Sequence, residues 1–105
     1  MANILILGAG SMSTAFAFPC SDNNHQVSIV GTHLEDNFID IIKANKNTHP
    51  ILKSKIPNNV KIYKFSSFHN LLKDADLIVL GVSSKGIHWA SEQLISIRNN
   101  QQILI

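Results

Sequence analysis

ILILGAGSMS, at residues 4–13, is the stretch that decides the fold. Its first four residues form a continuous apolar run, which is typical of a strand buried on both faces of a parallel sheet. Two glycines, Gly8 and Gly10, separate that run from a segment with helical periodicity that begins at Met12. A glycine-rich turn between a strand and a helix predicts a site where backbone amides meet a phosphate group.

The spacing of this turn has a chemical explanation. Gly8 permits the tight turn, and Gly10 lets the backbone approach a pyrophosphate with no Cβ in the way. The phosphates would rest on free N–H groups at the start of the helix, where the helix dipole favours negative charge. The third position of the pattern is normally glycine or alanine and keeps the helix close to the sheet, but here it is Ser13. A tight turn without a ligand is the alternative, and the surrounding strand and helix favour the dinucleotide site.

Strand-like and helix-like segments alternate along the whole chain. Further strands are predicted at residues 27–30, 60–63, 77–82 and 102–105. The run at 77–82 is apolar throughout and should be central in the sheet. The alternation predicts an α/β fold, namely a Rossmann-type parallel sheet of about five strands, flanked by helices and incomplete at the C-terminus.

Helical periodicity follows each of the first four strands. The first helix carries an apolar stripe made of Met12, Ala15, Phe16, Pro19 and Cys20. Pro19 lacks a backbone donor and should kink or shorten this helix. Further helices are predicted at 34–46, marked by Phe38, Ile41 and Ile42, after Ser66 or Ser67, and at 85–98. The segment 47–59 has no clear period and predicts a long loop.

Composition excludes several classes of protein. The 105 residues suit a single domain, 1–105, and a hydrophobic content of 45% is too high for a disordered chain. The net charge of +2 is spread along the sequence without a basic run, so no nucleic-acid partner is expected. No apolar stretch approaches the roughly 20 residues of a membrane span. Because the sequence has no signal peptide and only one cysteine, Cys20, we expect a cytoplasmic protein. The five histidines show no metal-ligand spacing, so no metal site is expected.

The end of the second strand bears on the choice of cofactor. Dinucleotide sites of the simplest type place an acid there to hold the ribose 2′-hydroxyl. Thr32 and His33 occupy these positions, and no carboxylate appears before Glu35. We therefore expect Thr32 and His33 near the adenosine ribose, and a site that tolerates NADP. The alternative for His33 is a solvated loop histidine.

Several linked segments resemble the NAD(P)-dependent glycerol-3-phosphate dehydrogenases. Residues 8–15, GAGSMSTA, are similar to the family's opening GAGSWGTA, and residues 74–84, DADLIVLGVSS, are similar to its DADLIVLAVPS. The segments NNHQV at 23–27 and PNNV at 57–60 also match the family's pattern. The chain departs from that pattern at Met12, Ser13, Thr32 and Ser83, which replace an aromatic residue, glycine, arginine and proline.

The resemblance covers nearly the whole chain and has functional implications. It implies a cytoplasmic oxidoreductase that interconverts dihydroxyacetone phosphate and glycerol 3-phosphate for phospholipid synthesis. It also implies cofactor contacts in three places: at the phosphates through the backbone of Ser11 and Met12, beside the adenosine at Thr32 and His33, and near the nicotinamide ribose at Val82 and Ser83.

The family's catalytic lysines would lie beyond the sequence, one just after the fifth strand and one in a helical C-terminal domain. We therefore assign no catalytic residue, interpret Lys85 as a solvated helix residue, and expect the chain alone to bind NAD or NADP without turnover. A sheet cut at its fifth strand should expose an apolar edge, so we expect self-association or a homodimer. Two alternatives remain: the cofactor domain of another two-domain reductase, of ketopantoate or hydroxyacid type, or a non-enzymatic NAD-sensing module.

Overall fold

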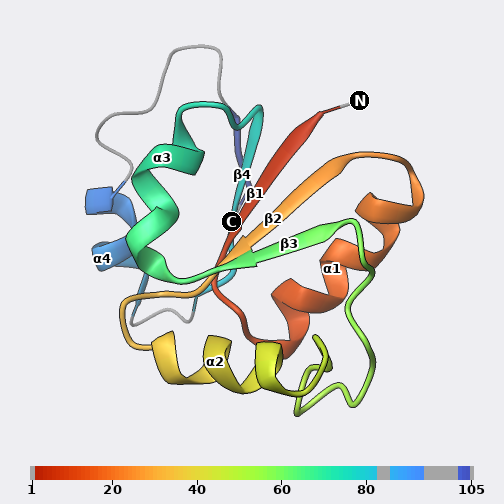
Figure 1. Cartoon of the computed structure of the whole chain (residues 1–105). Helices are drawn as coiled ribbons and strands as arrows, with labels where there is room; N and C mark the ends of the chain where they lie inside the picture. The colour runs from red at the N-terminus through yellow and green to blue at the C-terminus, as the bar shows by residue number, and fades with distance from the viewer. Residues whose placement is uncertain (1, 83–85, 94–101, 105) are drawn as a thin grey trace.

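The computed structural model describes residues 2–82, 86–93 and 102–104, and its centre is a five-stranded parallel sheet (Figure 1). The strands are β1 (Asn3–Leu7), β2 (Gln26–Val30), β3 (Val60–Tyr63), β4 (Leu77–Leu80) and β5 (Gln102–Leu104). Their order is β3-β2-β1-β4-β5, and every neighbouring pair is parallel. The predicted Rossmann-type sheet of about five strands is confirmed, with β1 at the centre and β4 beside it.

The helices lie on both faces of this sheet. They are α1 (Ser11–Asp22), α2 (Asp36–Ala44), α3 (Phe68–Leu72), which follows a 3-10 turn at Phe65–Ser67, and α4 (Ile87–Gln93). Figure 1 shows α1 and α2 on one face, and α3 and α4 on the other. Residues 85 and 94–98 of the last predicted helix lie outside the described residues.

The two faces of β1 explain its continuous apolar sequence. Ile4 and Ile6 belong to the core beneath α1 and α2, whereas Leu5 and Leu7 belong to the core beneath α3 and α4. All four side chains are at most 5% exposed. Successive strand residues point to opposite faces, and burying each such side chain stabilises the fold by about 1.5–3 kcal/mol.

Small residues form the buried face of α1, which differs from the predicted apolar stripe. Among its described side chains, from residue 13 to residue 22, the buried ones are Ser13, Thr14, Ala17 and Ser21, and the side chain of Met12 lies outside the description. Ala15 and Pro19 are exposed, and Phe16 and Cys20 are half-buried. The reason is close packing at the start of the helix, where a Cβ added to Gly81 would lie 2.3 Å from the Ser13 Cβ. The helix also continues three residues beyond Pro19, so the expected shortening is wrong.

The other elements agree with the sequence in position and differ in detail. In α2 the buried residues are Ile39 and Ile42, whereas Ile41 is 47% exposed. Ser67 precedes α3 but makes no side-chain capping hydrogen bond. The segment between α2 and β3 is a loop, as predicted, with one bridge between Thr48 and Lys55.

The switch in strand order positions a site. The chain moves outward from β1 to β3 and then crosses back to β4 on the other side of β1. At such a switch point the connections leave in opposite directions and open a crevice at the carboxyl ends of the strands. The turn after β1 lies at the mouth of this crevice.

Candidate functional site

A hollow of about 520 Å³ lies at the carboxyl ends of β1, β2 and β4. Segments far apart in sequence form its wall, which consists of Gly10, Thr32, His33, Leu34, Glu35, Gly81, Val82, Gly86 and Trp89. Four of the predicted site residues, Gly10, Thr32, His33 and Val82, are therefore brought together. Ser83 lies outside the described residues.

The Gly8 position accepts no other residue without strain. Its φ of 116° is a conformation that L side chains rarely adopt. A Cβ added there would lie 2.4 Å from the Gly81 carbonyl oxygen, at the end of β4. The Gly8 amide also donates a 2.7 Å hydrogen bond to the Val30 carbonyl, which fixes the turn against β2. This glycine is required by the protein itself.

The Gly10 position is different, because nothing in the described part of the chain requires a glycine there. Its φ of −66° and ψ of 169° suit any residue, and an added Cβ would have no described neighbour within 4 Å. That open space lies over the start of α1, where a phosphate would have to approach. The turn therefore leaves room for a phosphate to approach the start of α1, as a dinucleotide pyrophosphate would require.

Ser13 occupies the position where the pattern usually has glycine or alanine, and its buried side chain stabilises the turn. Its hydroxyl lies 3.0 Å from the Gly8 carbonyl oxygen and 3.2 Å from the Gly10 carbonyl oxygen, and its single proton can be donated to either. The Thr14 amide donates to the same Gly10 oxygen at 3.0 Å. Ser13 is only 8% exposed, so its side chain supports the turn. Ser11 and Met12 begin α1, and the first amides of a helix have no partner within it.

Glu35 is a site residue that the sequence argument missed. Its Oε1 accepts hydrogen bonds from the Ala9 amide at 3.1 Å and the Thr32 amide at 2.9 Å. A carboxylate thus lies between the glycine-rich turn and the end of β2, where we had expected none. The Glu35 amide donates a hydrogen bond to the Thr32 carbonyl, and the turn that this bond closes brings the Glu35 side chain back to the end of β2. The expectation that no carboxylate lies at the end of β2 is therefore wrong, and an acid within one turn of the strand end was the signal to look for, whereas NADP tolerance itself stays a prediction.

His33 packs against aromatic rings at the edge of the hollow. Its ring centroid lies 4.3 Å from that of Trp89 and 6.3 Å from that of Phe65. The Trp89 and Phe65 centroids are 5.1 Å apart. His33 is exposed, yet it is not a freely solvated loop histidine, because one ring face is covered by Trp89. Trp89, from α4, is a second site residue that the sequence argument did not single out.

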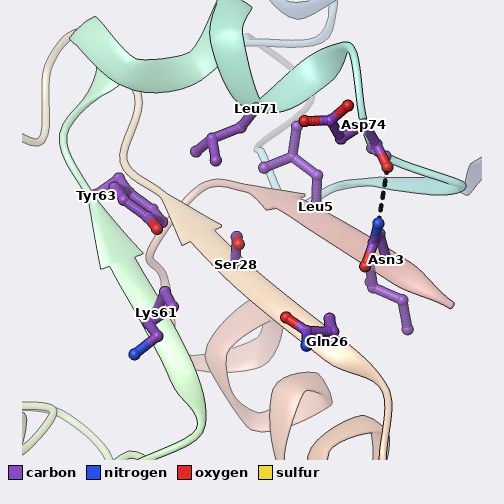
Figure 2. A pocket seen from close by; sticks show the side chains of 10 residues that line it. Asn3, Leu5, Gln26, Ser28, Lys61, Tyr63, Leu71 and Asp74 are labelled. Carbon is purple, nitrogen blue, oxygen red and sulfur yellow. Dashed lines mark hydrogen bonds between the residues drawn. The ribbon is translucent and has the colours of Figure 1, made fainter. Parts of the chain in front are cut away.

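A second hollow of about 270 Å³ lies on the α3 face of the sheet. Figure 2 shows its lining, in which Gln26, Ser28 and Lys61 project from β2 and β3. Asn3 closes one side by donating its Nδ2 to the Asp74 carbonyl at 3.1 Å. This hollow contains no residue of the glycine-rich turn. Within the described parts of the chain, no group of three or more metal-binding side chains occurs.

Three features together define a nucleotide-binding domain of the Rossmann class: a parallel sheet with this strand order, a glycine-rich first turn, and a hollow at the switch point. Residues 3–105 match the family model described as NAD-dependent glycerol-3-phosphate dehydrogenase N-terminus. The chain therefore belongs to this family.

No helix in the part that the structure describes has the length and apolarity needed to cross a membrane.

Individual relatives agree with the family match. The chain is 31% identical over 102 residues to the NADP(+)-dependent glycerol-3-phosphate dehydrogenase of Archaeoglobus fulgidus, covering 97% of this chain and 30% of that protein. It is 32% identical over 94 residues to the glycerol-3-phosphate dehydrogenase [NAD(P)+] of Oceanobacillus iheyensis, covering 90% of this chain and 26% of that protein. The chain thus spans about 30% of the length of such relatives.

Solved structures show the same fold. The glycerol-3-phosphate dehydrogenase of Coxiella burnetii superposes with a TM-score of 0.83 at 23% identity, over 97% of this chain and 31% of that chain. A Rex-family repressor superposes with a TM-score of 0.61 at 14% identity, over 99% of this chain and 52% of that chain. At these identities the likeness concerns the fold alone.

Proposed function

We propose that the chain is the cofactor-binding domain, 1–105, of a cytoplasmic NAD(P)-dependent glycerol-3-phosphate dehydrogenase, which interconverts dihydroxyacetone phosphate and glycerol 3-phosphate for phospholipid synthesis. The observation that carries the proposal is the turn itself. Gly8 is demanded by the fold, whereas the missing Cβ at Gly10 serves only a ligand that approaches the start of α1. The nicotinamide cofactor supplies the hydride when it is bound.

The residues of the hollow have separate roles in this proposal. The Gly10 amide and the first amides of α1, at Ser11 and Met12, hold the pyrophosphate. Thr32 and His33 lie by the adenosine, with Trp89 beside His33 as an aromatic wall. Val82 lies near the nicotinamide ribose, because it follows β4 on the other side of the switch point, and Ser83, predicted beside it from the sequence, lies outside the described residues.

Glu35 makes NAD the preferred cofactor in this proposal. A carboxylate held at the end of β2 can accept a hydrogen bond from a ribose hydroxyl, but it repels a 2′-phosphate. The side chain is held in this position because the Ala9 and Thr32 amides both donate hydrogen bonds to its Oε1. We expect NADH to bind at least about tenfold more tightly than NADPH, since nearby like charges at a protein surface repel by a few kcal/mol.

Glu35→Gln tests this preference. Glutamine keeps the size of the side chain and an oxygen for the two amides, and it removes the charge. Calorimetric titration should show that the ratio of NADH to NADPH affinity falls toward one. Asp36→Asn is the matched control, because Asp36 is an adjacent, exposed carboxylate outside the hollow, and this variant should keep the wild-type ratio. Equal affinities of the wild-type chain for the two cofactors would refute the preference, and binding of neither would refute the proposed function.

The chain alone should bind the cofactor without turning over substrate. The family members that it matches are far longer, since it covers 30% and 26% of the two relatives described above. Hydride transfer also needs a placed carbonyl and a proton donor, and we assign neither to this chain. Loss of NADH absorbance on adding dihydroxyacetone phosphate would contradict this expectation.

A further inference from the structure

His49 is a completely buried histidine in the loop between α2 and β3. Its Nε2 lies 2.9 Å from the Ala9 carbonyl oxygen, inside the glycine-rich turn. Its Nδ1 accepts hydrogen bonds from the Ile51 amide at 3.1 Å and the Leu52 amide at 3.2 Å. A nitrogen that accepts from two amides carries no proton, so the proton of the neutral ring is on Nε2. Nε2–H therefore donates to the Ala9 carbonyl.

The surroundings of His49 fix the direction of this donation. Its own amide donates to the Ser54 carbonyl at 3.0 Å, and its carbonyl accepts from the Lys53 amide at 2.8 Å. The Phe38 ring packs edge-on against the imidazole, with centroids 5.3 Å apart and planes at 71°. The loop and α2 thus hold the imidazole in one orientation, and a single donor points at the turn.

Peptide geometry links this hydrogen bond to the hollow. No cis peptide bond occurs in the described residues, so the peptide that joins Ala9 and Gly10 is trans. In a trans peptide the C=O and N–H groups point in opposite directions. Because the Ala9 carbonyl points inward to His49, the Gly10 N–H points away from the core, on the side where Gly10 lines the hollow.

The preceding peptide, which joins Gly8 and Ala9, is held by other side chains. The Gly8 carbonyl accepts a hydrogen bond from the Ser13 hydroxyl, and the Ala9 N–H donates one to Glu35. Of the four polar groups in these two peptides, three have partners among the residues that the structure describes, and the one without such a partner is the Gly10 N–H. Without His49 the Ala9–Gly10 peptide could flip, because Gly10 has no Cβ to oppose rotation. A flipped peptide would present a carbonyl oxygen to a phosphate.

We propose that His49 is a positioning residue for the pyrophosphate: its Nε2–H holds the Ala9–Gly10 peptide so that the Gly10 amide faces a phosphate oxygen. This inference rests on the proposed function, because it requires a dinucleotide at the turn. It assigns no direct ligand contact to His49, which acts through the backbone of the turn.

Two substitutions separate the two hydrogen-bonding roles of the ring. In His49→Asn the side-chain oxygen can take the place of Nδ1 and accept from the Ile51 and Leu52 amides, but no donor reaches Ala9. In His49→Gln the longer side chain can donate its amide N–H to the Ala9 carbonyl. We expect His49→Asn to lower the affinity for NADH and ADP about tenfold and to leave adenosine affinity unchanged. His49→Gln should stay within about threefold of the wild type.

The control is His25→Asn. His25 also accepts a backbone amide on Nδ1, from Ala2 at 3.0 Å, but it lies at the opposite end of the sheet, and its substitution should change none of these affinities. Unchanged NADH affinity in a folded His49→Asn variant would overturn the inference. An equal loss for NADH and adenosine would overturn it as well, because that pattern indicates general loosening of the hollow.

A second measurement needs no variant and can refute the inference even if His49→Asn does not fold. The amide proton of Gly10, followed by nuclear magnetic resonance in the wild-type chain, should move downfield when ADP is added and stay in place when adenosine is added. A Gly10 signal that does not respond to ADP would overturn the inference. If the wild-type chain binds neither NADH nor ADP, the proposed function fails first.

Discussion

A methyl group added at Gly8 should lower the stability of the fold, whereas the same group added at Gly10 should lower the affinity for the cofactor. At Gly8 the φ of 116° would be retained by an alanine at an energetic cost of about 1–3 kcal/mol. The new Cβ would also lie 2.4 Å from the Gly81 carbonyl oxygen, and such overpacking adds about 1–3 kcal/mol. We therefore expect Gly8→Ala to lower the free energy of unfolding by about 4 kcal/mol, a large part of the stability of a small domain.

At Gly10 the same methyl group meets no atom of the described residues within 4 Å. The residue is the N-cap of α1 and has no side-chain cap to lose, so Gly10→Ala should change stability by less than about 1 kcal/mol. The methyl group does fill the space above the first amides of the helix. A pyrophosphate could no longer reach them, and we expect NADH affinity to fall by at least about tenfold.

Two measurements separate these effects. Urea unfolding, followed by the fluorescence of the single tryptophan, Trp89, gives the stability of each variant. Calorimetric titration with NADH gives the affinity. The reasoning is refuted if Gly10→Ala binds NADH as tightly as the wild type, or if Gly8→Ala unfolds at the wild-type urea concentration.

Three further predictions follow from other features. Among the residues that the structure describes, Thr14 Oγ1 is buried without a hydrogen-bond partner, so Thr14→Val should raise the free energy of unfolding by about 1 kcal/mol in a urea titration, and a loss of stability would contradict this. Burial raises the pKa of the Cys20 thiol, so less thiolate is present at pH 8, and a disulfide reagent should react more slowly with the folded chain than with the chain in urea; equal rates would count against it. Strands β3 and β5 are the sheet edges, so we expect self-association in light scattering, and a monomer at all concentrations would exclude it.

Local pattern predicted the sheet well and the packing of α1 poorly. The apolar runs at β1 and β4 identify interior strands because both of their faces are buried. Periodicity failed on α1 because it detects large apolar side chains, whereas the helix lies so close to Gly81 that small residues such as Ser13 and Ala17 occupy its inner face. The distance between a helix and a sheet is a tertiary property that hydrophobicity alone does not encode.

The candidate site was predictable where it depends on local backbone. Gly8 could be assigned because the shape of the turn requires it, and Gly10 was assigned because a phosphate near the start of the helix would need the space of its missing Cβ. Glu35 was missed because the expected acid was sought by counting residues, and the turn from Thr32 to Glu35 shortens the spatial distance. His49 lies in a loop without periodic pattern, and no sequence signal indicates that its ring reaches the Ala9 carbonyl, 40 residues away.

These long-range contacts have a consequence for how the proposed phosphate site forms during folding. The first strand, turn and helix contain the whole glycine motif, yet the Ala9 amide and carbonyl are fixed by partners from positions 35 and 49. A nascent chain that has reached only β2 would carry the motif without its final shape. Cofactor binding should emerge only after the loop before β3 has docked, and a bound dinucleotide should in turn protect that loop from proteolysis.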